Sequence, residues 1–306
     1  MNILVTGANG QLGSELHDLI LKQYPMSHTP YATFFFTDKN ELDITDKNAI
    51  EYFCEKNHID VIVNCAAYTA VDKAEEEQLM ADSINHLAVK YLAEISKARS
   101  IKLIHISTDY VFDGKNFKPY VETDETNPQG VYGASKLAGE KAMQEIYPPS
   151  SIIIRTSWVY SSYGSNFVKT MLRLAKERDE LGVIFDQVGT PTYARDLAET
   201  ILKIISRYGE LDIGDSEKNN TISNVEIYHY SNEGVCSWYD FAKAIFEISG
   251  LSCKVNPIET AEYPTPAARP SYSLLNKAKI KKVYNITIPY WRDSLNECLI
   301  KIMNAE

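Results

Sequence analysis

Short apolar runs alternate with helical patterns through the first half of this chain. The runs are predicted to be strands, and they cover residues 3–6, 33–37, 61–64, 102–107 and 152–155. This alternation is typical of βαβ units and predicts an α/β fold with a doubly wound parallel sheet. In such sheets ligands bind beyond the carboxyl ends of the strands. The residues that directly follow strands are therefore the first candidates for a functional site.

The regular alternation weakens after residue 157, and a chain of 306 residues is long enough for a principal domain and a smaller one. We predict one domain over residues 1–157 and a mainly separate lobe over 158–306. A segment near 183–210 is expected to return to the first domain. Helices are predicted at 167–178 and 239–249. The proline-rich segment 263–270 is predicted to be an ordered loop, because proline has no amide hydrogen for a helix interior.

Composition excludes several classes of function. The formal charge of −10 is spread along the chain, which disfavours nucleic acid or an anionic membrane as a partner. No stretch approaches the 18 or so apolar residues of a membrane span, and the first residues resemble a strand rather than a leader. The five cysteines have no metal-like spacing, which favours free thiols and a cytoplasmic location.

A glycine-rich turn separates the first predicted strand from the first helical pattern. Glycine at position 7 permits a tight turn, glycine at 10 lets a pyrophosphate approach the backbone, and glycine at 13 allows close helix packing. The free amides at the start of the helix attract a phosphate. A plain strand-to-helix turn is the alternative, but this context favours a dinucleotide site. The cofactor-binding residues predicted here are Gly7, Asn9, Gly10, Gln11, Leu12 and Gly13.

The second predicted strand is followed by Asp38 and Lys39. A carboxylate at this place suits a hydroxyl of the adenosine ribose, whereas a lysine suits a 2′-phosphate. The pair leaves the choice between NAD and NADP open, and a solvated strand terminus is the alternative. Asp46 is a predicted N-cap for the next helix. Further cofactor-binding residues predicted at this edge are Asp43 and Ile44 after the second strand and Ala66, Ala67 and Tyr68 after the third.

Three further residues indicate chemistry at the dinucleotide. Thr108 follows the fourth strand, and Tyr132 and Lys136 lie four residues apart on one predicted helical face. An ammonium near a phenol lowers the pKa of the phenol, which suits it to give a proton to a carbonyl as hydride arrives. An ordinary surface pair is the alternative for this spacing. No nucleophile elbow or metal-ligand spacing supports a rival chemistry, and His105 is predicted to be a satisfied residue inside a strand.

At these motifs the chain resembles the extended short-chain dehydrogenase/reductases and, within them, the family of dTDP-4-dehydrorhamnose reductases. The glycine turn and segments 66–75, 107–114, 132–140 and 155–160 carry the resemblance, and 166–171, 186–192 and 263–270 extend it. It implies a Rossmann-type domain, NADPH or NADH as cofactor, and reduction of the C4 ketone of a dTDP-linked 4-keto-6-deoxyhexose. The product would be dTDP-L-rhamnose, a precursor of cell-surface polysaccharide.

The resemblance also implies roles for individual residues. Tyr132 would donate the proton, Lys136 would also hold the nicotinamide ribose, and Thr108 would polarise the ketone. Related 4,6-dehydratases carry an Asp-Glu pair after the strand-end threonine, whereas this chain has Asp109-Tyr110, which favours simple reduction. For Trp158 the alternative is core packing. For Lys169 and Arg269 the alternative is an ordinary surface charge. The substrate-binding residues implied are Thr108, Asp109, Tyr110, Trp158, Asn166, Lys169 and Arg269.

Some relatives form homodimers through magnesium held by glutamates. Glu15 and Glu297 match two of these positions, but Arg195 stands at the third, and an arginine opposes a cation. Magnesium and the homodimer are therefore doubtful expectations. Two other functions stay open at this stage. One is a cofactor-binding regulatory subunit, which the beta subunit of methionine adenosyltransferase exemplifies, and the other is a reductase for a different NDP-4-keto-6-deoxyhexose.

Overall fold

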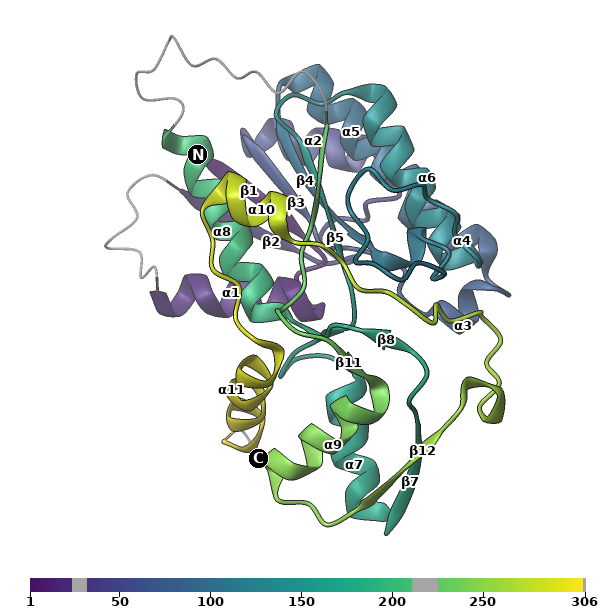
Figure 1. The fold of residues 1–306 in the computed structure, drawn as a ribbon. Helices are drawn as coiled ribbons and strands as arrows, with labels where there is room; N and C mark the ends of the chain where they lie inside the picture. The colour runs from purple at the N-terminus through teal and green to yellow at the C-terminus, as the bar shows by residue number, and fades with distance from the viewer. Residues whose placement is uncertain (24–31, 211–224, 305–306) are drawn as a thin grey trace.

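The computed structural model describes residues 1–23, 32–210 and 225–304 (Figure 1). Its centre is a six-stranded sheet with the strand order β10-β5-β4-β3-β1-β2, in which every neighbouring pair is parallel. The strands are β1 Asn2–Thr6, β2 Thr33–Thr37, β3 Val61–Asn64, β4 Lys102–Thr108, β5 Ile152–Thr156 and β10 Glu226–His229. The five strands predicted from the apolar runs and the Rossmann-type α/β class are confirmed.

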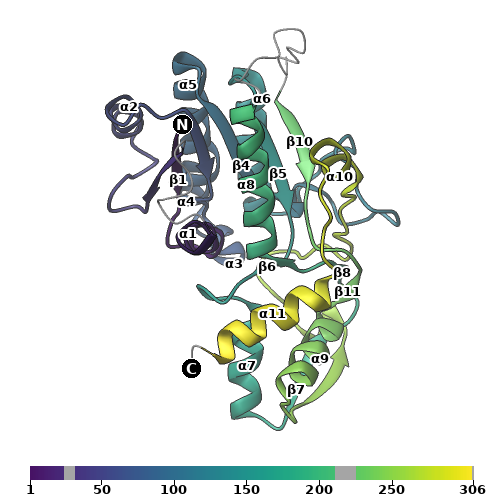
Figure 2. The same cartoon turned by 90° about the vertical axis from the view of Figure 1, so that its left-hand side faces the viewer.

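Helices cover both faces of this sheet, and we call the resulting three-layer unit the first lobe (Figure 2). On one face, α1 and α8 contribute apolar side chains to a core that includes Leu16 and Ile201. On the other face, α2, α5 and α6 build a second core around Leu92 and Met143. The helices of this lobe are α1 Gln11–Gln23, α2 Lys47–Lys56, α5 Ala88–Arg99, α6 Val131–Ile146, α8 Ala194–Glu210 and α10 Ala278–Tyr284.

Several short elements lie at the edge of the sheet near the strand ends. They are α3 Val71–Ala74, α4 Gln78–Asp82, a π-helical turn Ser83–Leu87 and a 3-10 turn Asp109–Val111. A second 3-10 turn, Thr260–Glu262, lies away from this sheet, where Thr260 donates to Asp186. The π turn lies between α4 and α5 without a break. Such turns occur often at functional sites because they displace the side chains of one helical turn. The segment 263–270 contains no helix, as its prolines predict.

A smaller second lobe lies below the carboxyl ends of the sheet strands in Figure 1. Its helices surround an aromatic core that includes Phe241 and Trp291. Its elements are β6 Val159–Tyr160, α7 Phe167–Glu177, β7 Glu180–Ile184, β8 Val188–Gly189, β9 Thr192–Tyr193, β11 Cys236–Ser237, α9 Trp238–Ser249, β12 Lys254–Ile258 and α11 Trp291–Met303. The predicted helices near 167–178 and 239–249 correspond to α7 and α9.

The chain passes between the two lobes more than once. After the second lobe begins, α8 returns to the sheet and packs against α1, and β10 then extends the sheet beside β5. The division predicted at residue 157 stays a prediction. No helix in the described ranges combines the length and apolar character that a bilayer crossing requires. All five cysteines are free thiols, as predicted.

Candidate active site

The glycine turn has the geometry of a phosphate cradle. Gly7 has a φ of +68°, which disfavours other residues, and a Cβ there would lie 2.7 Å from the backbone nitrogen of Ala66. A Cβ on Gly13 would collide with the Gly7 carbonyl oxygen. The Gly10 amide donates to the Gly7 carbonyl at 3.0 Å, which closes the turn directly before α1 begins at Gln11. The turn therefore exposes backbone amides at a helix N-terminus, and its residues fit a dinucleotide.

A carboxylate stands at the end of the cavity where an adenosine ribose would lie. The Asn9 side-chain amide donates to Asp38, and the Asn40 backbone amide donates to Asp38 Oδ1 at 2.7 Å. A hydrogen bond with the Glu41 carboxyl and the one from Asn40 lower the pKa of Asp38. Lys39 lines the same cavity. Both the ribose-binding carboxylate and the phosphate-binding lysine are therefore available, and the preference between NADH and NADPH stays open.

The end of β3 is held in place by the π turn. Asn85, 1% exposed, accepts a hydrogen bond from the Tyr68 amide at 2.9 Å and donates to the Tyr68 carbonyl and to Ser135. The π turn also brings Ser83 and Ile84 to the cavity wall. Sequence analysis did not identify these residues, because no glycine, proline or periodic signal marks a π turn within a helix.

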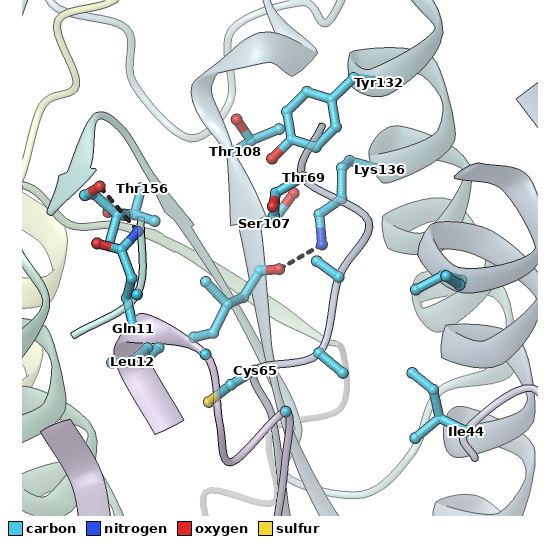
Figure 3. Close-up of a pocket in the computed structure, with 18 of the residues that line it drawn as sticks. Gln11, Leu12, Ile44, Cys65, Thr69, Ser107, Thr108, Tyr132, Lys136 and Thr156 are labelled. Carbon is cyan, nitrogen blue, oxygen red and sulfur yellow. Dashed lines mark hydrogen bonds between the residues drawn. The ribbon is translucent and has the colours of Figure 1, made fainter. Parts of the chain in front are cut away.

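The three predicted reacting residues lie together at the carboxyl end of β4 and the start of α6. Figure 3 shows the hydroxyls of Thr108 and Tyr132 above the ammonium of Lys136. That ammonium donates to the carbonyl of Ile106 at 2.7 Å and lies 3.3 Å from Nε2 of His105. The Nδ1 atom of His105 lies 3.0 Å from the Asn64 side-chain amide, so this histidine is satisfied, as predicted.

One electrostatic expectation for this group is wrong. Desolvation raises the pKa of Tyr132 to about 12, although a hydrogen bond with Thr108 opposes the rise. Desolvation also lowers the pKa of Lys136 to about 8, although the Glu140 carboxylate opposes the fall. The ammonium bonds to the Ile106 carbonyl, and the cost of burying a phenolate dominates the pKa of Tyr132. Tyr132 is therefore a protonated phenol at neutral pH, which is the form a proton donor requires.

A buried ion pair anchors α6 to the sheet beneath these residues. Arg155 on β5 donates three hydrogen bonds to Glu140 on α6, from Nη2 to Oε2 at 2.7 Å and from Nε to Oε1 at 3.0 Å and Oε2 at 3.2 Å. The exposed fractions of the two side chains are 3% and 0%. Ser107, the neighbour of Thr108, also donates to Glu140. The pair therefore links β4, β5 and α6 directly below the reacting residues, and sequence analysis did not anticipate it.

Most of the predicted residues line one cavity of about 1010 Å³ that extends from the glycine turn to Trp158. Those in its wall are Gly7, Asn9, Gly10, Gln11, Leu12, Asp38, Lys39, Asp43, Ile44, Ala66, Ala67, Thr108, Asp109, Tyr110, Tyr132, Lys136, Trp158 and Asn166. Two predicted cofactor-binding residues, Gly13 and Tyr68, are not in this wall: Gly13 packs against Gly7 and Ala8, and the Tyr68 hydroxyl donates to Glu77 at 2.7 Å. Residues that sequence analysis missed include Met80, Ile106, Thr156, Gly164 and Ser165.

Trp158 lies between the cavity and the core of the second lobe, and its role in substrate binding stays a prediction. It lines the cavity, and its indole stacks on Trp238 with the ring centroids 3.7 Å apart. Its backbone has a φ of +49°, which is rare for an aromatic residue. A Cβ on Gly189 would lie 2.9 Å from the Trp158 ring. The second lobe therefore holds the indole of a residue that also lines the cavity.

Two predicted substrate residues lie outside the cavity wall. Lys169 lines a separate hollow on the second lobe together with Arg173 and Lys301. Arg269, in the proline-rich loop, donates to Asp72 at 2.7 Å, and its second terminal nitrogen is buried without a partner in the described part of the chain. Their assignment to the substrate diphosphate stays a prediction.

The residues at the proposed magnesium position do not fit a divalent cation. Glu15 is fully buried and accepts hydrogen bonds from Lys301 at 2.8 Å and from Ser161 at 2.6 Å. Arg195 lies 3.7 Å from the same carboxylate. No group of three potential metal ligands, with or without Glu297, occurs among the described residues. Lys301 and Arg195 therefore provide the positive charge that a cation would supply. The homodimer stays a prediction.

Chelation is accordingly expected to have no effect on this protein. EDTA treatment should change neither the Tm nor the molar mass in solution, because the negative charge of Glu15 is already paired. Thermal unfolding and light scattering, before and after chelation, measure the two quantities. A lower Tm in EDTA that added Mg²⁺ restores would contradict this prediction.

Comparison with known proteins agrees with this geometry. The protein-family model described as RmlD substrate binding domain matches residues 1–304. The chain belongs to this family. The dTDP-4-dehydrorhamnose reductase of Aggregatibacter actinomycetemcomitans is 43% identical over 300 residues, which cover 96% of each protein.

Solved structures of the same kind superimpose on the RmlD-family chain over nearly its whole length. A dTDP-4-dehydrorhamnose reductase from Clostridium acetobutylicum has a TM-score of 0.88 at 40% identity and covers 99% of this chain and 100% of its own. One from Bacillus anthracis, in complex with NADP, has a TM-score of 0.87 at 38% identity and covers 98% and 99%. The family assignment therefore applies to both lobes.

Proposed function

We propose that this chain is an NAD(P)H-dependent reductase that converts the C4 ketone of dTDP-4-dehydro-6-deoxy-L-mannose to the hydroxyl of dTDP-L-rhamnose. One observation carries the proposal. Thr108, Tyr132 and Lys136 line the same continuous cavity as the glycine turn and Trp158. The cavity therefore has room for a dinucleotide beside a sugar nucleotide, with the hydroxyl donors between them. The full-length identity to dTDP-4-dehydrorhamnose reductases supports the choice of substrate.

The reduced nicotinamide, when bound, supplies a hydride to the ketone carbon. Tyr132 gives its phenolic proton to the ketone oxygen, and the phenolate that remains is neutralised later by a proton from solvent. Thr108 donates a second hydrogen bond to the same oxygen. The Lys136 ammonium, on the same helical face as Tyr132, stabilises the transient negative charge on the phenol. We assign these three roles on the basis of their positions in the cavity.

The identity of the residue after Asp109 distinguishes reduction from dehydration. Elimination of water from a sugar requires a carboxylate base beside the acid, and the chain has Tyr110 there. The Tyr110 ring packs edge-on against Tyr132, with the centroids 5.5 Å apart. Burial raises the pKa of Tyr110 well above its ordinary value, so it is a poor base at neutral pH. Reduction without elimination is the chemistry that this pair supports.

An assay with both cofactors tests the proposal. Purified protein is mixed with dTDP-4-dehydro-6-deoxy-L-mannose and either NADPH or NADH, and the loss of reduced-cofactor absorbance is followed. The product is identified by NMR of its C4 proton. Turnover to dTDP-L-rhamnose is expected. Dinucleotide binding without turnover would favour the regulatory subunit, and turnover only with another NDP-sugar would change the substrate. Dehydration of dTDP-glucose would contradict the proposed reaction.

A further inference from the structure

A buried carboxyl group adjoins the proposed ketone site. Asp109 is 2% exposed and lines the cavity. Its Oδ1 atom accepts the hydroxyl hydrogen of Thr108, with the oxygens 2.9 Å apart. Its Oδ2 atom is buried and has no hydrogen-bond partner in the described part of the chain. A carboxylate with an unpaired buried oxygen is unfavourable, so this arrangement favours the neutral acid.

The hydroxyl of Thr108 has one hydrogen and two lone pairs, which limits what it can do at once. One lone pair accepts the Tyr110 amide at 3.2 Å, and the hydrogen is given to Asp109. Tyr132 lies within hydrogen-bonding reach of the same oxygen. While Asp109 is ionised, it therefore takes the hydrogen that the proposed reaction needs at the ketone.

Protonation of Asp109 reverses this hydrogen bond. A neutral carboxyl group donates its own hydrogen to the remaining lone pair of Thr108, and the Thr108 hydrogen becomes free. Both lone pairs of Thr108 are then filled, by Asp109 and by the Tyr110 amide, so Tyr132 is also released from this oxygen. Two hydroxyl hydrogens then become available to the ketone, with no other change in the protein.

The groups that face Asp109 do not stabilise its charge strongly. Tyr132 on α6 and Tyr110 on its own turn are neutral at pH 7, and the charges that act on Tyr110, Arg269 and Asp72, form an ion pair with each other. Asp109 forms no ion pair within the described ranges. Burial raises the pKa of Asp109 to about 7, although the hydrogen bond from Thr108 and the nearby Ser273 hydroxyl, which forms no hydrogen bond within the described ranges, oppose the rise. Both protonation states are therefore populated near neutral pH.

We propose that Asp109 is a positioning residue that, as a neutral carboxylic acid, directs the Thr108 hydroxyl to the substrate ketone, and that its ionisation withdraws this donor. The inference rests on the proposed function and adds pH control to it. The rate of hydride transfer is therefore high below the pKa of Asp109 and falls as the pH rises through that pKa. Lys136, with a pKa of about 8, contributes a separate and later decline.

The rate of a single hydride transfer, measured from about pH 5.5 to about pH 9, tests the proposal. In wild type the rate should decline with a midpoint near 7. Asp109→Asn should keep the low-pH rate within about tenfold and lose this decline, since its amide donates to Thr108 as the acid does. Only the later decline from Lys136 should remain. An unchanged midpoint in this variant, or an equal large loss at every pH, would overturn the proposal.

Two further variants make the result specific. Ser273→Ala removes a nearby hydroxyl that favours the ionised form of Asp109, so the midpoint should move to higher pH. Asp113→Asn changes a carboxylate that bonds to Lys115 and Tyr120 outside the cavity, and it should leave the profile unchanged. A midpoint that Ser273→Ala leaves in place, or that Asp113→Asn moves, would also overturn the proposal.

A measurement without cofactor or substrate separates this inference from the proposed function. The infrared band of a protonated carboxyl group should disappear with a midpoint near pH 7 in wild type and be missing in Asp109→Asn. If Asp109→Asn shows the same infrared band as wild type, the proposal is overturned even if the enzyme is active. If instead the proposed function fails, wild type will show no hydride transfer at any pH, whereas the infrared result will stand.

Discussion

Replacing Tyr132 with phenylalanine is expected to lower kcat for the proposed reduction by about 100- to 10,000-fold, which is the usual contribution of a positioned general acid. The variant keeps the aromatic ring, which packs against Tyr110, but it has no proton to give. The dissociation constant of the reduced dinucleotide, measured by fluorescence titration, should stay within a few-fold of wild type. The glycine turn and Asp38, which we propose bind the other end of the cofactor, are unaffected.

Tyr147→Phe is a matched control for this substitution. Tyr147 follows the last residue of the same helix, and its side chain is 48% exposed. Its loss of a hydroxyl should leave kcat unchanged. A Tyr132→Phe enzyme with the wild-type rate would remove Tyr132 from the mechanism, whereas a variant that no longer binds dinucleotide would show that the phenol is structural.

Replacing Arg155 with methionine is expected to lower the free energy of unfolding by about 3–5 kcal/mol, because it leaves the Glu140 carboxylate buried and unpaired. The pair lies on β5 and α6 with almost no solvent exposure. The urea midpoint, monitored by circular dichroism, measures the loss. Adding Glu140→Leu should restore much of the stability, since two apolar residues replace a buried ion pair at little cost.

A surface ion pair provides the control for this prediction. Arg173 and Glu177 lie one turn apart on α7 with exposed fractions of 60% and 51%. Arg173→Met should change the free energy of unfolding by less than about 1 kcal/mol, because water already screens the charges. The prediction is contradicted if Arg155→Met and Arg173→Met lose comparable free energies of unfolding. It is also contradicted if the double variant at Arg155 and Glu140 is less stable than Arg155→Met alone.

The parts of the fold that sequence analysis predicted depend on local signals. The apolar runs placed all five strands within one or two residues, because a strand buried on both faces has few polar positions. Asp46 caps α2 as predicted, with its carboxylate accepting the Asn48 and Ala49 amides. The turn from Gly7 to Gly13 was equally predictable, since its positive φ and its close backbone contacts exclude other residues.

The electrostatics of the site were predicted less well. The four-residue spacing of Tyr132 and Lys136 correctly put them on one helical face, but it contained no information on burial or on the Ile106 carbonyl that binds the ammonium. The predicted decrease in the pKa of Tyr132 was therefore wrong, since desolvation depends on every segment around the phenol. The metal position was uncertain for the same reason until Lys301, far away in sequence, was found beside Glu15.

By itself, the sequence determined the residues that meet at the strand ends and the chemistry that their side chains can perform. Periodicity and turn residues are local signals that span only a few positions in the sequence. Parallel strands then bring their carboxyl ends to one edge of the sheet. Only the tertiary structure decided which of these groups are desolvated and which hydrogen bonds compete. The Glu140 and Arg155 pair, the stack of Trp158 on Trp238 and the hydrogen bond from Lys136 to the Ile106 carbonyl are contacts of this kind. They arise where distant segments pack together, and a pKa responds to that whole environment rather than to neighbours in the chain.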